Sequence, residues 1–286
     1  MKRVIYSLYI DIPRNELDLF DEKVLGKNKI PINHATKHSF KLHYPKLLAC
    51  KHAYAYETGV DFKMFEYDSN FIMFKENFNK KYPFVTSYNI VNFYKLHLLY
   101  KLAEEYDEIL YLDFDVVPVT KESFFDKWDF QKGICVYDNT YKVQKMEIIS
   151  EKTNTIRSPS SKYYNTQAML FAHNLSMKNK VINTGIIGTN KKYLEKLNYF
   201  GSFDEDISLM TELKTDTSFF PKKIVDFFGY DNETLFSFKL EQNKVPVQWL
   251  DSEWHYFFSS QQFIPKETKL IHAINKNFDL IWKLYD

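Results

Sequence analysis

The chain has 286 residues, of which 45% are hydrophobic and 18% aromatic, and this composition excludes an intrinsically disordered protein. Its 38 basic and 37 acidic residues nearly balance, so charge gives no reason to expect a nucleic acid or an anionic membrane as a partner. The sequence contains no run of about 18 apolar residues that could form a membrane span. We therefore expect a single domain over residues 1–286.

Two features of the sequence bear on its location. The two cysteines, Cys50 and Cys135, are too few for a disulfide framework and lack metal-ligand spacing, which favours a reducing compartment. The basic start of the chain leads into a short apolar run that ends at Asp11 and Pro13, and this pattern predicts a first strand rather than a signal peptide. We therefore expect a cytoplasmic protein, in the cytoplasm of a host cell if the chain is viral.

The periodicity of apolar residues predicts the elements of secondary structure. In chain order, strands are expected near 3–10, 62–67, 108–114, 133–137, 168–172, 181–188, 245–250 and 268–274. Helices are expected near 40–57, 88–105, 121–127, 191–199, 205–214, 231–242 and 277–285. Because strands alternate with helices early in the chain, an α/β fold with a parallel sheet is predicted.

Two segments are distinctive within this scheme. The helix over 88–105 has the clearest apolar periodicity, with Ser87 as its expected N-cap, and it leads directly into the strand near 108–114. Residues 138–166 are polar and aperiodic, so they predict a long loop insertion, and loops of that length are usually functional or mobile.

The strand near 108–114 has the sequence EILYLDFD and ends in two acidic residues, Asp113 and Asp115. Residues two apart in a strand share a face, and ligands of open α/β sheets bind beyond the carboxyl ends of the strands. Carboxylate oxygens suit Mg²⁺ or Mn²⁺, and such a cation would remove the cost of burying two like charges. The pair therefore predicts a divalent metal site. The alternative is a solvated pair of acids, with Asp115 starting a turn.

An apolar strand followed by Asp-X-Asp and further apolar residues resembles the signature of metal-dependent GT-A glycosyltransferases. The resemblance is greatest to the retaining family that includes glycogenin and the lipopolysaccharide galactosyl- and glucosyltransferases, family eight of the sequence classification. Further positions of that family's pattern follow in order over about residues 90 to 280, namely Lys95 in NFYKLHLLYKL, Asn183 and Gly185 in VINTGIIGTN, Asp231, Asn232 and Glu233 in YDNETLFSF, and His272 and Lys276 in KLIHAINKN. The chain departs from the family in having Lys95 where Arg is usual and Asp-Asn-Glu where Asp-Gln-Asp is usual.

This resemblance implies both a fold and an activity. The fold would be GT-A, a Rossmann-like α/β domain with a mixed, mostly parallel central sheet flanked by helices. The activity would be that of a hexosyltransferase that takes a sugar from a nucleotide-sugar donor, usually UDP-glucose or UDP-galactose, and retains the anomeric configuration. The acceptor would be a glycan or a protein. The implied cofactor is Mn²⁺ (or Mg²⁺), held by Asp113, Asp115 and His272.

The resemblance also gives the donor contacts. Asp113 would lie near the donor's ribose or sugar, and the two cations Lys95 and Lys276 would lie at its diphosphate. Asn183 would hydrogen-bond the donor sugar or the acceptor, where Gly185 allows close approach of the backbone. Each of these residues could instead have a purely structural role. Lys95 and Lys276 could be solvated surface lysines, Asn183 could lie on an edge strand, and His272 could pack without binding a metal.

The expected catalytic residues are Asp231 and Asn232. Asn232 is the amide near the anomeric centre, as a front-face retaining mechanism requires, although it is shorter than the usual Gln. Asp231 would hydrogen-bond the donor sugar or orient the acceptor. Asp231 is equally suited to cap the helix expected over 231–242, so that structural role stays open.

The position of the first strand predicts that Tyr6, Ser7 or Tyr9 contacts the nucleotide base. Two other functions compete with the transferase. A nucleotidyltransferase can share the fold, but its Gly-rich phosphate loop should follow the first strand, where IDIPRNELDLF has no glycine. A degenerate, non-catalytic sugar- or nucleotide-binding protein of the same fold is the second alternative, and loss of Asp115 would separate it from an enzyme.

Overall fold

The computed structural model describes residues 1–16, 32–145, 158–215, 228–259 and 263–285. The chain divides into two compact units. Unit 1 comprises Met1–Asp129, Gly185–Gly188 and Leu250–Asp286, and unit 2 comprises Phe130–Thr184 and Thr189–Trp249.

The main sheet of unit 1 is built around β1 (Arg3–Tyr9). This strand pairs in parallel with β2 (Asp61–Glu66) on one side and with β3 (Glu108–Leu112) on the other. Beyond β3 the order continues to β6 (Ile182–Asn190), of which residues 185–188 belong to this unit. All five residues of β3 are buried, as expected for an apolar strand inside a parallel sheet.

Unit 1 also contains a smaller sheet in the order β4-β9-β8. Strand β4 (Val116–Pro118) pairs antiparallel with β9 (Leu270–Ala273), and β9 pairs in parallel with β8 (Tyr256–Phe258). The register places Val116 opposite His272. Because β4 follows β3 after only three residues, this pairing brings the C-terminal part of the chain to the end of β3.

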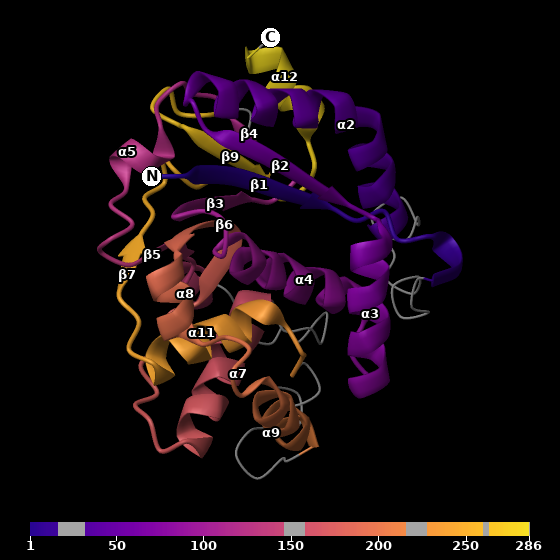
Figure 1. The fold of residues 1–286 in the computed structure, drawn as a ribbon, viewed down its shortest axis with the longest axis vertical. Helices are drawn as coiled ribbons and strands as arrows, with labels where there is room; N and C mark the ends of the chain where they lie inside the picture. Colours follow the sequence, from indigo (N-terminus) through magenta and orange to yellow (C-terminus); the bar gives the residue numbers. More distant parts are fainter. Residues whose placement is uncertain (17–31, 146–157, 216–227, 260–262, 286) are drawn as a thin grey trace. The chain divides into compact units, whose positions relative to one another are not determined.

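The helices of unit 1 lie on both faces of its main sheet (Figure 1). Helix α2 (Ile32–Glu57) lies on one face, and α4 (Ser87–Leu102) lies on the other, next to α3 (Ser69–Lys81). Shorter elements are η1 (Arg14–Glu16), α5 (Phe124–Lys127) and α12 (Phe278–Tyr285). The N-cap of α4 is Thr86, whose hydroxyl accepts from the Asn89 N–H, so the expectation of Ser87 was wrong by one residue.

In unit 2 the strand order is β6-β5-β7, with β5 (Ile134–Asp138) parallel to β7 (Val247–Trp249). Its helices are α6 (Tyr141–Lys145), α7 (Ser158–Ala172), α8 (Lys191–Leu197), α9 (Phe203–Thr215) and α11 (Asn232–Gln242). Helix α7 packs along α11 (Figure 1). Nine consecutive residues of α11, from Asn232 to Leu240, are buried, so this helix forms the centre of the unit.

The predicted α/β fold with mostly parallel strands flanked by helices is confirmed. The strand expected over 168–172 is wrong, because these residues end helix α7. A short apolar run fits a buried helix as well as a strand, and Ala, Met and Leu are strong helix formers. The segment 138–166, expected to be one long loop, has helix α6 near its start and the beginning of α7 at its end, and 146–157 lie outside the described residues.

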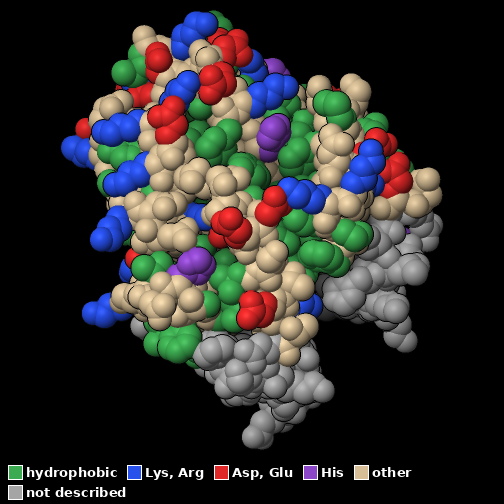
Figure 2. All heavy atoms as spheres, turned by 60° about the horizontal axis from the view of Figure 1, so that its bottom comes forward, with side chains coloured by type: hydrophobic (Ala, Val, Ile, Leu, Met, Phe, Trp, Pro, Cys, Tyr) green, Lys and Arg blue, Asp and Glu red, His purple; other side chains and the backbone are tan. Residues whose placement is uncertain are grey.

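Among the residues that the structure describes, every helix is too short or too polar to span a lipid bilayer. On the face drawn in Figure 2, acidic and basic side chains are interspersed with apolar and neutral polar surface. This mixed surface agrees with the balanced composition of the sequence.

Candidate metal and donor site

The two aspartates of the sequence motif lie in a turn that joins two strands of unit 1. Strand β3 ends at Leu112, and the turn is closed by the Val116 N–H, which donates to the Asp113 carbonyl at 2.9 Å. The Asp113 N–H donates to the Gly185 carbonyl at 2.7 Å, and the Ser7 hydroxyl donates to the Leu112 carbonyl at 2.7 Å. The end of β3 is therefore fixed on both sides before the turn begins. The turn, rather than the alternation of an extended strand, presents both carboxylates.

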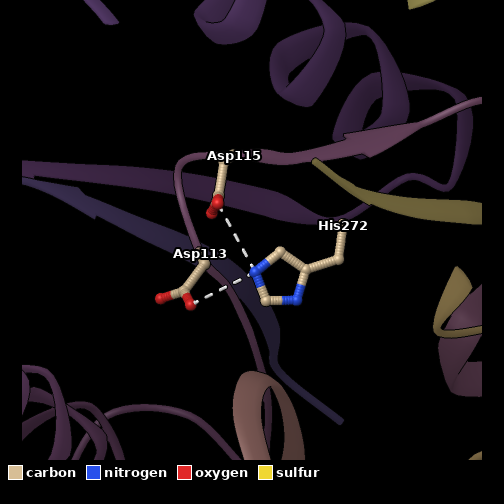
Figure 3. Close-up of side chains that lie close together, drawn as sticks. All are labelled: Asp113, Asp115 and His272. Atoms are coloured by element: carbon tan, nitrogen blue, oxygen red, sulfur yellow. Dashed lines mark ion pairs between the residues drawn. The ribbon is translucent and has the colours of Figure 1, made fainter. Parts of the chain in front are cut away.

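The third member of the cluster is His272, on β9 (Figure 3). Its Nε2 lies 3.4 Å from Asp115 Oδ2 and 3.9 Å from Asp113 Oδ2. One candidate ligand atom from each of the three residues lies within 4.8 Å of the others. The resemblance-based prediction that His272 joins the two aspartates is therefore confirmed as a spatial cluster within unit 1.

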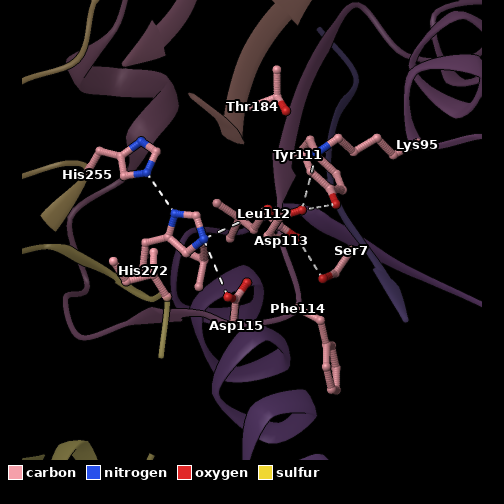
Figure 4. A network of polar contacts seen from close by, with 12 residues as sticks. Ser7, Lys95, Tyr111, Leu112, Asp113, Phe114, Asp115, Thr184, His255 and His272 are labelled. Atoms are coloured by element: carbon pink, nitrogen blue, oxygen red, sulfur yellow. Dashed lines mark hydrogen bonds and ion pairs between the residues drawn. The ribbon is translucent and has the colours of Figure 1, made fainter. Parts of the chain in front are cut away.

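Two lysines and a tyrosine lie beside the carboxylates, and Figure 4 shows Lys95 and Tyr111 next to Asp113. The Lys276 ammonium lies 2.5 Å from Asp115 Oδ2, and the Lys95 ammonium lies 3.5 Å from Asp113 Oδ1. The Tyr111 hydroxyl donates to Asp113 Oδ1. Lys95 is only 3% exposed, which excludes a surface lysine, and Lys276 is largely covered, which excludes a solvated one.

These contacts have electrostatic consequences. Burial alone would raise the pKa of Asp115, but the charges of Lys276 and His272 hold that pKa well below its usual range. Burial alone would lower the pKa of Lys276, but Asp115 raises it. Burial, reinforced by the charge of Asp113, raises the pKa of Tyr111, so its phenol stays protonated and can donate. The cluster therefore keeps Asp115 ionised and ready to serve as a ligand.

A second histidine lies behind the first. His255 is fully buried, and its Nε2 lies 3.0 Å from His272 Nδ1. A metal would need the lone pair of His272 Nε2, so the proton of a neutral His272 would sit on Nδ1 and donate to His255. The donor set, two carboxylates and an imidazole nitrogen held from behind, fits a divalent metal that accepts both oxygen and nitrogen, as Mn²⁺ does.

The residues expected from the first strand have structural contacts. Tyr6 and Ser7 are fully buried, and their hydroxyls donate to the carbonyls of Lys95 and Leu112, each at 2.7 Å. Tyr9 stacks on Phe114 with 4.9 Å between ring centroids. These side chains hold the strand ends and the helix that carry the site. Contact of any of the three with a nucleotide stays a prediction.

The expected catalytic residues lie in unit 2, at the start of α11. Asp231 is the N-cap, and its carboxylate accepts from the backbone N–H groups of Glu233 at 3.1 Å and Thr234 at 2.9 Å. The Asn232 amide donates to the Thr184 hydroxyl at 3.0 Å, and Glu233 accepts from the Thr184 N–H at 2.7 Å. The capping role that the sequence left open is confirmed. A catalytic role for Asp231 or Asn232, and a donor contact for Asn183 of β6, stay predictions.

Three contributors to the site were missed from the sequence: Tyr111, His255 and Lys51, which contacts the Asp113–Asp115 turn and is described below. Tyr111 could have been found, because it lies two residues before Asp113 on the same strand. His255 and Lys51 come from distant segments without a motif. Only the fold brings them to the turn.

Comparison with known proteins found similar solved structures but no matching sequence family. No family model matches the sequence, and no curated protein matches it. Solved structures that resemble the chain include a glycosyltransferase involved in glycosylation of the major capsid of PBCV-1, with 11% identity, a TM-score of 0.47 and coverage of 99% of this chain and 100% of the other. Mouse xyloside xylosyltransferase 1 has 11% identity and a TM-score of 0.47, with coverage of 96% and 98%.

The galactosyltransferase LgtC, solved with donor and acceptor sugar analogues, has 14% identity and a TM-score of 0.41, with coverage of 75% of this chain and 66% of the other. These structures are all described as glycosyltransferases, the class that the sequence resembles. Because each TM-score lies below 0.5, the function is inferred below from the residues of the site.

Proposed function

We propose that this chain is a metal-dependent glycosyltransferase that moves a hexose from a nucleotide-sugar donor to a glycan or protein acceptor. The observation that carries this proposal is the cluster of Asp113, Asp115 and His272, whose candidate ligand atoms lie within 4.8 Å of one another. UDP-glucose or UDP-galactose is the proposed donor, and the proposed outcome is retention of the anomeric configuration within one catalytic domain. Location in the cytoplasm stays a prediction.

In this proposal the residues of unit 1 hold the leaving group. Asp113, Asp115 and His272 would bind Mn²⁺ or Mg²⁺. The metal would supply Lewis-acid stabilisation of the charge that develops on the departing nucleoside diphosphate. Lys276 and Lys95 already lie beside the two carboxylates, so their ammonium groups are positioned to contact an anion that binds there.

The proposed roles of unit 2 concern the sugar. Asp231 would orient the acceptor or hydrogen-bond the donor sugar, and Asn232 would present its amide near the anomeric centre. Asn183 of β6 would bind the donor sugar or acceptor, and Gly185 of unit 1, two residues further along the strand, would allow close approach of the backbone. Burial raises the pKa of Asp231, and Lys162 partly offsets that effect. A carboxyl group with a raised pKa is a common feature of functional sites, which supports this assignment without requiring it.

One observation favours a second candidate, a non-catalytic binding protein of the same fold. The ammonium of Lys276 lies 2.5 Å from Asp115, so an internal cation already balances the charge of this carboxylate. A degenerate site that has lost its metal could persist in that form. A nucleotidyltransferase receives no such support, because residues 10–20, which directly follow β1, contain no glycine for a phosphate loop.

The deciding experiment is thermal unfolding of the wild-type chain with UDP, GDP or CMP, each with and without Mn²⁺. A ligand that binds only the folded state at about 100 times its Kd adds roughly 2.7 kcal/mol, which should raise the Tm by about 5 °C or more. One nucleotide that stabilises the protein only when Mn²⁺ is present would support the proposal and identify the donor class. Absence of stabilisation in every combination would contradict it.

Hydrolysis of the matching nucleotide sugar then separates the two candidates. The transferase should release the nucleoside diphosphate in the presence of Mn²⁺, and a non-catalytic binding protein should show the thermal shift without release. Asp115→Asn, which removes one proposed ligand with little change of shape, is the control for both measurements.

A further inference from the structure

A buried lysine from the first long helix contacts the turn that carries the two aspartates. Lys51 lies on α2 and is fully buried. Its ammonium donates to the Val116 carbonyl at 2.8 Å, to the Phe114 carbonyl at 2.9 Å, and more weakly to the Leu47 carbonyl of its own helix at 3.4 Å. It also lies 5.1 Å from the centroid of the Phe114 ring. Both strong contacts are therefore with the turn at residues 113–115 and the strand that follows.

This arrangement is unusual for a lysine. A buried ammonium is costly unless it is paired, and fully buried lysines are accordingly rare. Lys51 makes no salt bridge with any carboxylate in the described part of the chain, so backbone carbonyls satisfy it instead. Lys239 of unit 2 shows the ordinary solution, because it is equally buried and its ammonium lies 2.8 Å from the Asp206 carboxylate.

The carbonyls that Lys51 binds lie immediately before and after Asp115. Their contacts with one ammonium fix the peptide unit that precedes Asp115 and the peptide unit that follows Val116. From the opposite strand, the Ala273 N–H donates to the carbonyl of Asp115 itself at 3.0 Å. Three consecutive carbonyls, those of Phe114, Asp115 and Val116, are thus held by two different elements. The side chain of Asp115 points toward His272 (Figure 4), and its carboxylate also pairs with Lys276.

We propose that Lys51 is a positioning residue for the metal site, whose ammonium holds the Asp113–Asp115 turn in the conformation that binds a divalent cation. This inference rests on the proposed function in that the cation is the one proposed above. Lys51 does not touch the candidate ligand atoms. It acts through the backbone of the turn, as an outer-shell residue orients a ligand, and such residues typically change metal affinity by about 10- to 100-fold.

The test compares two buried lysines that differ in what they hold. Lys51→Met keeps an unbranched side chain that is one atom shorter and removes its donors. Lys239→Met makes the same change beside Asp206. Mn²⁺ affinity is measured by isothermal titration calorimetry, with and without UDP, at a temperature where circular dichroism shows both variants folded. We expect Lys51→Met to raise the Kd for Mn²⁺ by about 10- to 100-fold. Lys239→Met should leave it within about twofold, even where it lowers the Tm.

A second readout does not depend on the metal. Amide hydrogen exchange of Val116 and Ala273, whose N–H groups bind the Asp113 and Asp115 carbonyls, reports the order of the turn. Exchange at both amides should accelerate about tenfold in Lys51→Met and stay unchanged in Lys239→Met. If the wild-type chain shows no Mn²⁺ binding while Lys51→Met accelerates exchange, the proposed function fails and the role of Lys51 in the turn survives.

Two results would overturn the inference. The first is a Lys51→Met protein with a lower Tm but unchanged Mn²⁺ affinity and unchanged exchange at the turn. The second is an equal loss of affinity in both lysine variants, which would indicate general destabilisation. If Lys51→Met does not fold, Lys51→Gln replaces it, because its shorter, uncharged side chain weakens the contacts with the two carbonyls while keeping a polar group in the buried position. Its Kd should rise in the same direction, and an unchanged Kd would overturn the inference.

Discussion

Two short acidic segments of this chain look alike in sequence and differ in structure. Asp-Phe-Asp at 113–115 lies in the turn after β3, and Asp-Asn-Glu at 231–233 starts helix α11. The carboxylates of the first segment face a histidine and two lysines from other parts of unit 1. Those of the second accept backbone N–H groups of their own helix and of Thr184 in β6.

The groups that contact these carboxylates, rather than the acidic residues themselves, distinguish a candidate metal ligand from a helix cap. Backbone N–H groups of its own helix already satisfy Asp231, as expected at an N-cap, and Glu233 accepts the Thr184 N–H and pairs with the Lys162 ammonium. Asp113 and Asp115 face charged side chains that an incoming cation or anion could displace. A metal can therefore bind Asp113 and Asp115 without disrupting secondary structure. A substitution of Asp231 or Glu233, in contrast, also removes hydrogen bonds to helix α11 or to strand β6.

The largest effect is expected from Asp115→Asn. The substitution keeps the shape of the side chain and removes a charge that Lys276 and His272 both contact. The Kd for Mn²⁺ should rise by more than about 100-fold, beyond what outer-shell substitutions cause, and nucleotide-dependent thermal stabilisation should disappear. Calorimetry with Mn²⁺ checks this outcome. A variant that still binds Mn²⁺ within threefold of wild type would place the metal elsewhere.

The second-largest effect is expected at Asp231 in the second segment, which can both cap helix α11 and act in catalysis. Asn caps a helix as well as Asp does, so Asp231→Asn should keep the Tm while lowering sugar transfer by about 100-fold, as loss of a positioned group at a reacting centre does. Asp231→Ala removes the cap as well, which costs about 1 kcal/mol and should lower the Tm by roughly 2 to 4 °C. Full activity of Asp231→Asn would leave Asp231 as a cap alone.

The same comparison shows what the sequence could predict. The apolar run before Asp113 predicted a buried strand, because burial on both faces requires such a run, and the structure confirms it. Likewise, capping could be offered as an alternative role for Asp231 because capping depends on neighbours within three residues. The pairing of β4 with β9 could not be predicted, since each strand has only three or four residues and the partners are far apart in the chain. Consequently His255 was missed, although His272 was found through its motif. Lys51 was missed for a different reason, because it lies on α2, 63 to 65 residues before the carbonyls that it contacts, and carries no motif.

A smaller effect is expected at His255, which lies behind His272. His255→Leu removes the ring nitrogen that lies 3.0 Å from His272 Nδ1 and should raise the Kd for Mn²⁺ by about tenfold. His255→Gln can place its carbonyl oxygen near the position of the lost Nε2 and should recover most of that affinity. Calorimetry on both variants checks the prediction. Equal losses in the two would indicate that His255 acts through packing rather than through its hydrogen bond.

The smallest effect concerns the free energy of unfolding of the metal-free protein, measured with urea from pH 3 to 6. Asp115 and Asp231 should change this free energy with pH in opposite directions. In the folded chain the pKa of Asp115 lies below its ordinary 3.8, although burial alone would raise it, because Lys276 and His272 favour the carboxylate. The unfolded chain binds this proton at a higher pH. The stabilisation from Asp115 is therefore complete above about pH 5 and is lost as the pH falls through 3.8 and below.

Asp231 should behave in the opposite way. Burial raises its pKa above 3.8, so the folded chain binds its proton first, and stability is lost as the pH rises from 3.8 through the folded pKa. Asp115→Asn should thus remove part of the rise in unfolding free energy with pH, and Asp231→Asn should remove part of a fall. Each slope is limited to about 1.4 kcal/mol per pH unit for one proton. If both substitutions changed the pH profile in the same direction, the contrast between an ion-paired acid and a desolvated cap would be wrong.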